Sequence, residues 1–161
     1  MDKPTVLTMQ PGEWRYRLAE LCRDCALADA GEQADMLRMA RSLFAIAPED
    51  ASPADAWPVP GLDEFERLLM VGAWESAAFD LMPPEATCLV SRSGEDSCMA
   101  SVMLPGLAEE VSSDGDTVAM ALTSALAAAI SMLNAEDGRV VGLYHEERLS
   151  PGVRRAPSAL H

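Results

Sequence analysis

The stretch from Thr117 to Ala135 constrains the fold more than any other part of the chain, because it carries no charged residue. Its length is close to the roughly 20 residues that a membrane-spanning helix needs. It contains seven alanines and several hydroxyl side chains, however, and acidic residues flank it on both sides, where a membrane helix would have a basic flank. We therefore expect a buried alanine-rich helix and no membrane span, with an apolar stripe of Leu122, Leu126, Ile130 and Leu133.

The segments around this helix contain capping and turn residues. Asp114 and Asp116 are candidates to cap its N-terminus, and Gly138 is the candidate for its C-cap. Residues 107–116 are predicted to form an acidic loop. After the helix, residues 139–144 (RVVGLY) are a candidate third strand.

Two β-prone runs, residues 87–92 and 97–104, flank the turn sequence of residues 93–96 and predict a β-hairpin. With Arg92 opposite Ser97, the cysteines at 88 and 98 lie on opposite faces of the hairpin. A register shifted by one residue puts them on the same face but several residues apart. Neither register gives the Cα separation that a disulfide requires.

Helical periodicity predicts three further helical segments. Pro11 opens the first, and Gly31 separates it from the second, so these two helices should pack antiparallel as a hairpin. The third runs from Leu62 to the Pro83-Pro84 pair, with acids in its first turn.

Residues 48–61 are rich in proline and acids, which indicates a linker. The predicted organisation is an N-terminal arm and helical hairpin (1–47), the linker (48–61), an αββα module (62–145) and a C-terminal tail (146–161). The fold class is α+β. Because a two-stranded ribbon is marginally stable in water, we expect either a third strand or a homodimer formed through a sheet edge.

Three segments of the module resemble the phage ABA-sandwich domain, named for its αββα order. They are residues 88–94 (CLVSRSG), 99–106 (MASVMLPG) and 115–122 (GDTVAMAL). The resemblance covers roughly residues 62–135 and implies a phage or prophage setting. It implies no reaction and therefore no catalytic residues.

Cys22 and Cys25 form a C-x-x-C pair within the first predicted helix. Their spacing places both on its apolar stripe, which favours small buried side chains over the alternatives, a redox pair or half of a metal site. The N-terminus shows no secretory signal, so we expect a cytoplasmic protein with free thiols.

The chain has a net charge of −14. This charge argues against direct binding to nucleic acid or to an anionic membrane surface. It permits an acidic face that binds a basic protein partner. The candidate residues for this face are Asp63, Glu64, Glu66, Glu75, Glu95, Asp96, Glu109 and Glu110.

Patterns that carry enzyme chemistry are absent from the sequence: there is no phosphate-binding loop, and His145 lacks the second histidine of a metalloprotease motif. We name no catalytic residue and no cofactor. The leading interpretation is a small, acidic, non-enzymatic protein-interaction protein of phage or prophage character. Two alternatives stay open: an inhibitor that mimics nucleic acid and blocks a basic nucleic-acid-binding protein, and an unrecognised enzyme or metal protein.

Overall fold

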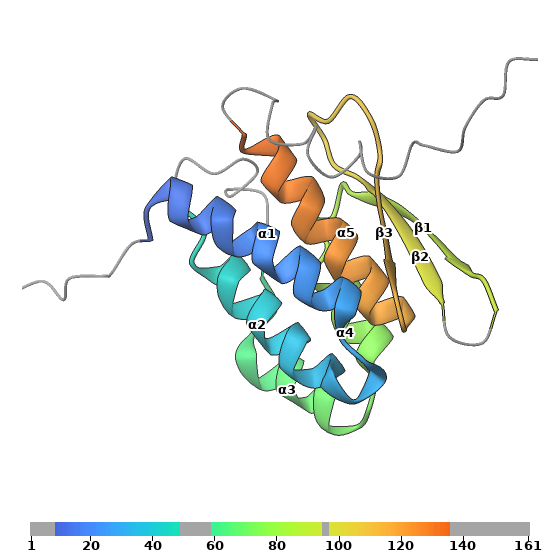
Figure 1. Cartoon of the computed structure of the whole chain (residues 1–161). Coiled ribbons are helices and arrows are strands. Elements are labelled where there is room, and N and C mark those ends of the chain that lie inside the picture. The colour runs from blue at the N-terminus through green and yellow to red at the C-terminus, as the bar shows by residue number, and fades with distance from the viewer. Residues whose placement is uncertain (1–8, 49–58, 95–96, 136–161) are drawn as a thin grey trace, which may run out of the picture.

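The computed structural model describes residues 9–48, 59–94 and 97–135. The predicted α+β class is confirmed: helices come first, and a three-stranded antiparallel sheet and a final helix follow (Figure 1). The elements are α1 (Pro11–Leu27), a 3-10 turn η1 (Ala30–Glu32), α2 (Gln33–Ala45), α3 (Leu62–Met70), α4 (Trp74–Asp80), β1 (Thr87–Arg92), β2 (Cys98–Met103), β3 (Val111–Gly115) and α5 (Val118–Leu133).

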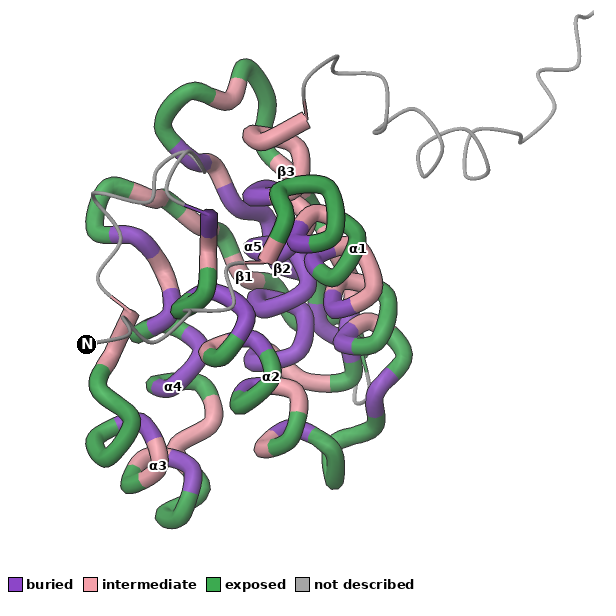
Figure 2. The backbone as a smooth tube through the Cα atoms, turned by 90° about the vertical axis from the view of Figure 1, so that its left-hand side faces the viewer, coloured by how far each residue is buried: buried purple, intermediate pink, exposed green. Residues whose placement is uncertain are grey.

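Helix α5 is the centre of the core. It lies between the sheet and α1, and most of its side chains are buried (Figure 2). Its small side chains let both neighbours approach closely: a Cβ atom added at Gly115 of β3 would lie 2.6 Å from the backbone nitrogen of Ala121. The expectation of a buried alanine-rich helix is therefore confirmed. In the part of the chain that the structure describes, no helix is long and apolar enough to cross a membrane.

Helices α1 and α2 form the predicted hairpin, with Pro11 at the start of α1 and η1 at the break. The indole Nε1 of Trp14 donates a hydrogen bond to the carbonyl oxygen of Leu43 at 2.9 Å, which joins the two helices inside the core. Residues Leu18, Leu21 and Cys25 line the buried face of α1. This face packs on α5, so the segments before and after residues 48–61 share one hydrophobic core.

The predicted single helix over residues 62–82 is wrong. The chain forms two short helices, α3 and α4, separated at Gly72, whose φ of +73° belongs to the left-handed region that favours glycine. The break turns α4 toward α2 and α5, where Ala77 and Ala78 become buried.

The sheet has the order β1-β2-β3. Strand β3 corrects the expectation of an acidic loop over residues 107–116, and Asp114 lies in this strand instead of capping α5. The cap is Thr117, whose Oγ1 accepts a hydrogen bond from the Met120 amide. At the other end, α5 stops at Leu133, before Gly138, so the predicted C-cap is also wrong. The candidate strand 139–144 lies outside the described residues.

In the hairpin of β1 and β2, Arg92 pairs with Cys98. This is the shifted one of the two registers considered above, and it puts Cys88 and Cys98 on the same face of the sheet. Their strand partners are Val102 and Arg92, so they are far apart along the strands, and both thiols are free.

Candidate interaction surface

The two faces of the sheet differ in what covers them. Every helix that the structure describes lies on one side of the sheet (Figure 1). Every second residue of a strand faces that side, and such residues of β3 contact α5. The Ser113 hydroxyl bonds to Ser124 of α5 at 2.6 Å, and Gly115 packs against Ala121. The opposite side, which we call the outer face, is formed by Thr87, Leu89, Ser91, Met99, Ser101, Met103, Ser112 and Asp114.

Leu89 and Met99 are the exposed apolar side chains of the outer face. Their exposed fractions are 70% and 44%, and no described helix lies over them. Between them and β3, the hydroxyls of Ser101 and Ser112 bond across the strands at 2.6 Å and satisfy each other. The outer face therefore presents two exposed apolar side chains beside a pair of serines that satisfy each other, an arrangement that can contact another apolar surface.

The acidic residues named from the sequence do not gather in one place. Asp63, Glu64 and Glu66 lie on α3, and Glu75 is in the first turn of α4. The loop between β2 and β3, which carries Glu109 and Glu110, lies at the end of the molecule opposite α3 (Figure 1). Glu95 and Asp96 lie outside the described residues. The described acids are thus divided between two ends of the molecule.

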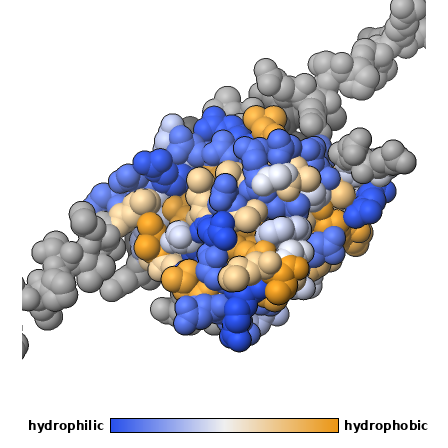
Figure 3. Space-filling view, turned by 90° about the horizontal axis from the view of Figure 1, so that it is seen from below, coloured by the Kyte–Doolittle hydropathy of each residue, from blue (hydrophilic) through white to orange (hydrophobic). Residues whose placement is uncertain are grey.

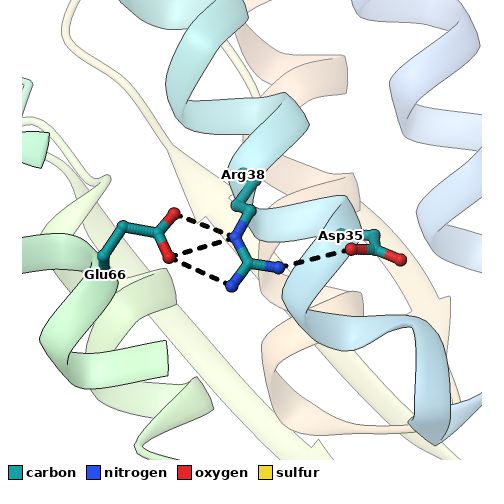
Figure 4. Close-up of polar contacts among 3 residues, drawn as sticks. All are labelled: Asp35, Arg38 and Glu66. Atoms are coloured by element: carbon teal, nitrogen blue, oxygen red, sulfur yellow. Dashed lines mark hydrogen bonds and ion pairs between the residues drawn. The ribbon is translucent and has the colours of Figure 1, made fainter. Parts of the chain in front are cut away.

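Glu66 already has a partner within the chain. Its carboxylate accepts hydrogen bonds from Nε of Arg38 at 2.9 Å and 3.2 Å and from the second amino nitrogen at 3.0 Å, while Arg38 also reaches Asp35 at 3.3 Å (Figure 4). These bonds join α2 to α3. They also lower the pKa of Glu66, because the hydrogen bonds and the positive charge of Arg38 favour the ionised carboxylate. Glu66 is therefore engaged in a contact between α2 and α3.

The lower end of the molecule, seen in Figure 3, is mixed in character. Apolar groups lie between hydrophilic ones there, without one continuous apolar area. On helix α3, Leu62 and Met70 are exposed at its two ends, and Asp63 and Glu64 lie in its first turn.

The C-x-x-C cysteines lie on the buried stripe of α1, as expected. Cys25 is fully buried and Cys22 is half-buried. Burial raises the pKa of both thiols, that of Cys25 to about 12, because desolvation disfavours a thiolate. Both are therefore neutral near pH 7 and poor nucleophiles. Within the described residues, no group of three or more histidine, cysteine or acidic side chains could hold a metal ion.

Sequence reasoning missed a polar network between α1, α5 and β3. Ser124 donates its hydroxyl proton to the carbonyl oxygen of Cys22 at 2.7 Å. Since a serine has only one proton to donate, Ser113 must be the donor in its 2.6 Å contact with Ser124, and the Cys22 thiol must donate in its 3.4 Å contact. The network fixes three elements to one another. The serine at 124 gave no signal of this role, because its partners are distant in sequence.

Comparison of the chain with protein-family models, curated proteins and solved structures found no match. The resemblance to the phage ABA-sandwich domain therefore stays a prediction.

Proposed function

We propose that this chain is a small, acidic, non-enzymatic protein-binding protein that docks an apolar surface of a protein partner on the outer face of its sheet. The observation that carries the proposal is Leu89, 70% exposed in the middle of β1 on a sheet face that no described helix covers. When an apolar surface of a partner covers this leucine, its side chain is removed from water, and the free energy of that burial favours binding.

The surroundings of Leu89 support an apolar contact over a charge contact. Its neighbours on the outer face are serines, threonine and methionines, and Asp114 at the far strand is the single acid of the face. The described acids among those that could imitate a nucleic-acid backbone are divided between two ends of the molecule, so these acids form no continuous anionic track. We place this binding in the cytoplasm, where thiols such as Cys88 stay reduced.

The test compares two charge-matched variants in a capture experiment from host lysate. Leu89→Asp puts a carboxylate on the outer face, whereas Leu27→Asp makes the same change at an 86% exposed leucine at the end of α1. We expect the native chain and Leu27→Asp to retain the same partner through a high-salt wash, and Leu89→Asp to lose it. High salt weakens exposed charge contacts and leaves apolar ones intact.

Two outcomes would contradict the proposal. Equal retention of the partner by both variants would show that the outer face is not the binding site. Release of a basic, nucleic-acid-binding partner by salt from all three proteins would instead favour the nucleic-acid mimic. Circular dichroism of each variant serves as the folding control, since both positions are exposed and neither change should unfold the chain.

A further inference from the structure

We propose that strand β1 pairs antiparallel with β1 of a second copy of this chain, so that two sheets join edge to edge across a twofold axis. This dimer would join two outer faces into one larger surface. The role of that surface in binding a partner rests on the proposed function. The occupant of the edge is a second copy. Three observations support it: the backbone geometry of β1, an edge that no described element covers, and complementary charges at its two ends.

The two edges of the sheet differ in protection. Natural edge strands avoid pairing with other chains through charged side chains, prolines, bulges or a covering element. The edge at β3 has these features: Asp114 is in the strand, Glu110 and Asp116 flank it, and α1 packs beside it. Strand β1 has neither charge nor proline from Thr87 to Ser91, pairs with β2 in regular register, and makes its main contacts with β2 and α5 among the described elements.

One hydrogen bond shows which backbone groups of β1 point outward. The amide of Ser93 donates to the carbonyl oxygen of Ser97 at 2.8 Å, so the pair of Ser93 and Ser97 is a hydrogen-bonded one. Such pairs alternate along an antiparallel ladder, so the odd-numbered residues of β1 bond to β2. The amides and carbonyls of Cys88, Val90 and Arg92 therefore point to the free edge, where a second strand can bind them.

This alternation limits the registers in which two copies can pair. We infer the register in which Cys88 bonds to Val90 of the second copy, and Val90 to Cys88. The twofold axis then passes between the two Leu89 residues, which face each other as a pair without backbone hydrogen bonds. In such pairs the side chains are closest, so the exposed Leu89 meets its own copy.

The charges near the ends of β1 agree with this register. Glu85 lies in the turn before the strand and Arg92 ends it, and both are exposed. Antiparallel pairing brings Arg92 of one copy beside Ala86 of the other, next to Glu85. The two outer faces then form one continuous surface, with both Leu89 side chains at its centre.

The first test uses sedimentation equilibrium on the purified full chain. We expect the apparent mass of the native chain to rise with concentration toward twice 17.2 kDa. Val90→Pro removes only an amide that points to the free edge, so the bonds to β2 remain and the dimer is lost. Leu27→Pro would disturb a helix, so the matched control is Leu27→Asp, which should keep the dimer mass. Circular dichroism checks that Val90→Pro keeps the sheet.

The second test fixes the register and does not depend on Val90→Pro folding. In a Cys88→Ala background, Leu89→Cys should form a disulfide between copies on mild oxidation, because opposed residues in non-hydrogen-bonded pairs have Cα atoms about 4.5 Å apart. Ser91→Cys, two residues along the same face, should not cross-link. Peptide mass mapping identifies the bond between the two copies of residue 89.

Each outcome decides the inference. A monomer at all concentrations, or a dimer that Val90→Pro leaves intact, overturns it. Cross-linking at residue 91 instead of 89 overturns the register. Loss of the partner in Leu89→Asp, together with a monomeric native chain, would leave the proposed function standing without the dimer.

Discussion

Single residues show how strongly burial changes the chemistry of this chain. Cys25 has the spacing of a redox or metal motif with Cys22, yet it lies fully inside the core beside α5. Desolvation is the largest cause that raises its pKa to about 12, and the nearby Cys22 and Asp24 add to the effect. The same burial that makes the thiol useful for packing makes it unreactive.

The raised pKa of Cys25 predicts a loss of stability in alkaline solution. Well below pH 9, the thiol is protonated in both the folded and the unfolded state, so the stabilising effect of the buried neutral thiol on the free energy of unfolding is fully present. Between pH 9 and about pH 12 the unfolded chain loses the proton more readily, and the free energy of unfolding falls by up to about 1.4 kcal/mol per pH unit from this one group.

Urea unfolding across this pH range measures the effect. Cys25→Ala should show a smaller slope of unfolding free energy against pH than the native chain, although it should be less stable near neutral pH because a buried side chain has been shortened. Replacing Cys88, which is half-buried and has a less strongly raised pKa, should leave most of the slope. An unchanged slope in Cys25→Ala would contradict this assignment.

At the scale of elements, the start of α5 is where local sequence signals and the structure differ most. Two acids precede the helix, and both have the side chains of good caps. Pairing of residues 111–115 with β2 takes Asp114 into the sheet, and Thr117 then becomes the cap. The Thr117 hydroxyl also donates to the buried side chain of Gln33 at 2.9 Å, which ties α5 to the start of α2.

Thr117→Ala should therefore destabilise the protein by about 1 kcal/mol, because α5 loses its cap and Gln33 loses a donor. Asp116→Asn, one residue earlier at the exposed cap position favoured by the sequence, should cost much less. Chemical denaturation of both variants measures the difference. A larger loss of unfolding free energy in Asp116→Asn than in Thr117→Ala would show that Asp116 is the cap.

For the whole molecule, the notable feature is that α5 connects parts that the sequence separates. Helix α1 packs on one side of α5 and the sheet on the other, and the Ser124 network reaches both. The described part of the chain therefore has one hydrophobic core, and the hairpin of α1 and α2 contributes side chains to it. The proline-rich and acidic residues 48–61 connect α2 to α3 in the sequence, and the elements before and after them share one core.

A shared core predicts cooperative unfolding. Leu18→Ala removes a buried side chain of α1 that has no exposed surface, and should cost about 2–5 kcal/mol. The tryptophan fluorescence, which reports partly on Trp14, and the far-ultraviolet circular dichroism should shift together in urea. Leu27→Ala, at an exposed leucine of the same helix, should stay within about 0.5 kcal/mol of the native chain. Separate transitions would show that the hairpin folds independently.

Local patterns by themselves determined a good part of the fold. Period-3.6 spacing located α1 and α2, Pro11 and the break near Gly31 set their bounds, and the uncharged run from Thr117 located α5. The β-prone runs on either side of the turn at 93–96 located β1 and β2. These signals are local, because helix faces, turns and caps are made by residues near each other in sequence.

The tertiary structure alone decided the rest. Residues 111–115 are polar and contain no strong strand signal, and they form β3 because β2 offers them bonding partners and α5 covers Ser113 and Gly115. The break at Gly72 depends likewise on the packing of α4 against α5. Which sheet face stays uncovered, where Leu89 lies, and how the acids are distributed follow from contacts between distant segments. Such contacts depend on how the elements are placed in space, which local residue patterns do not specify.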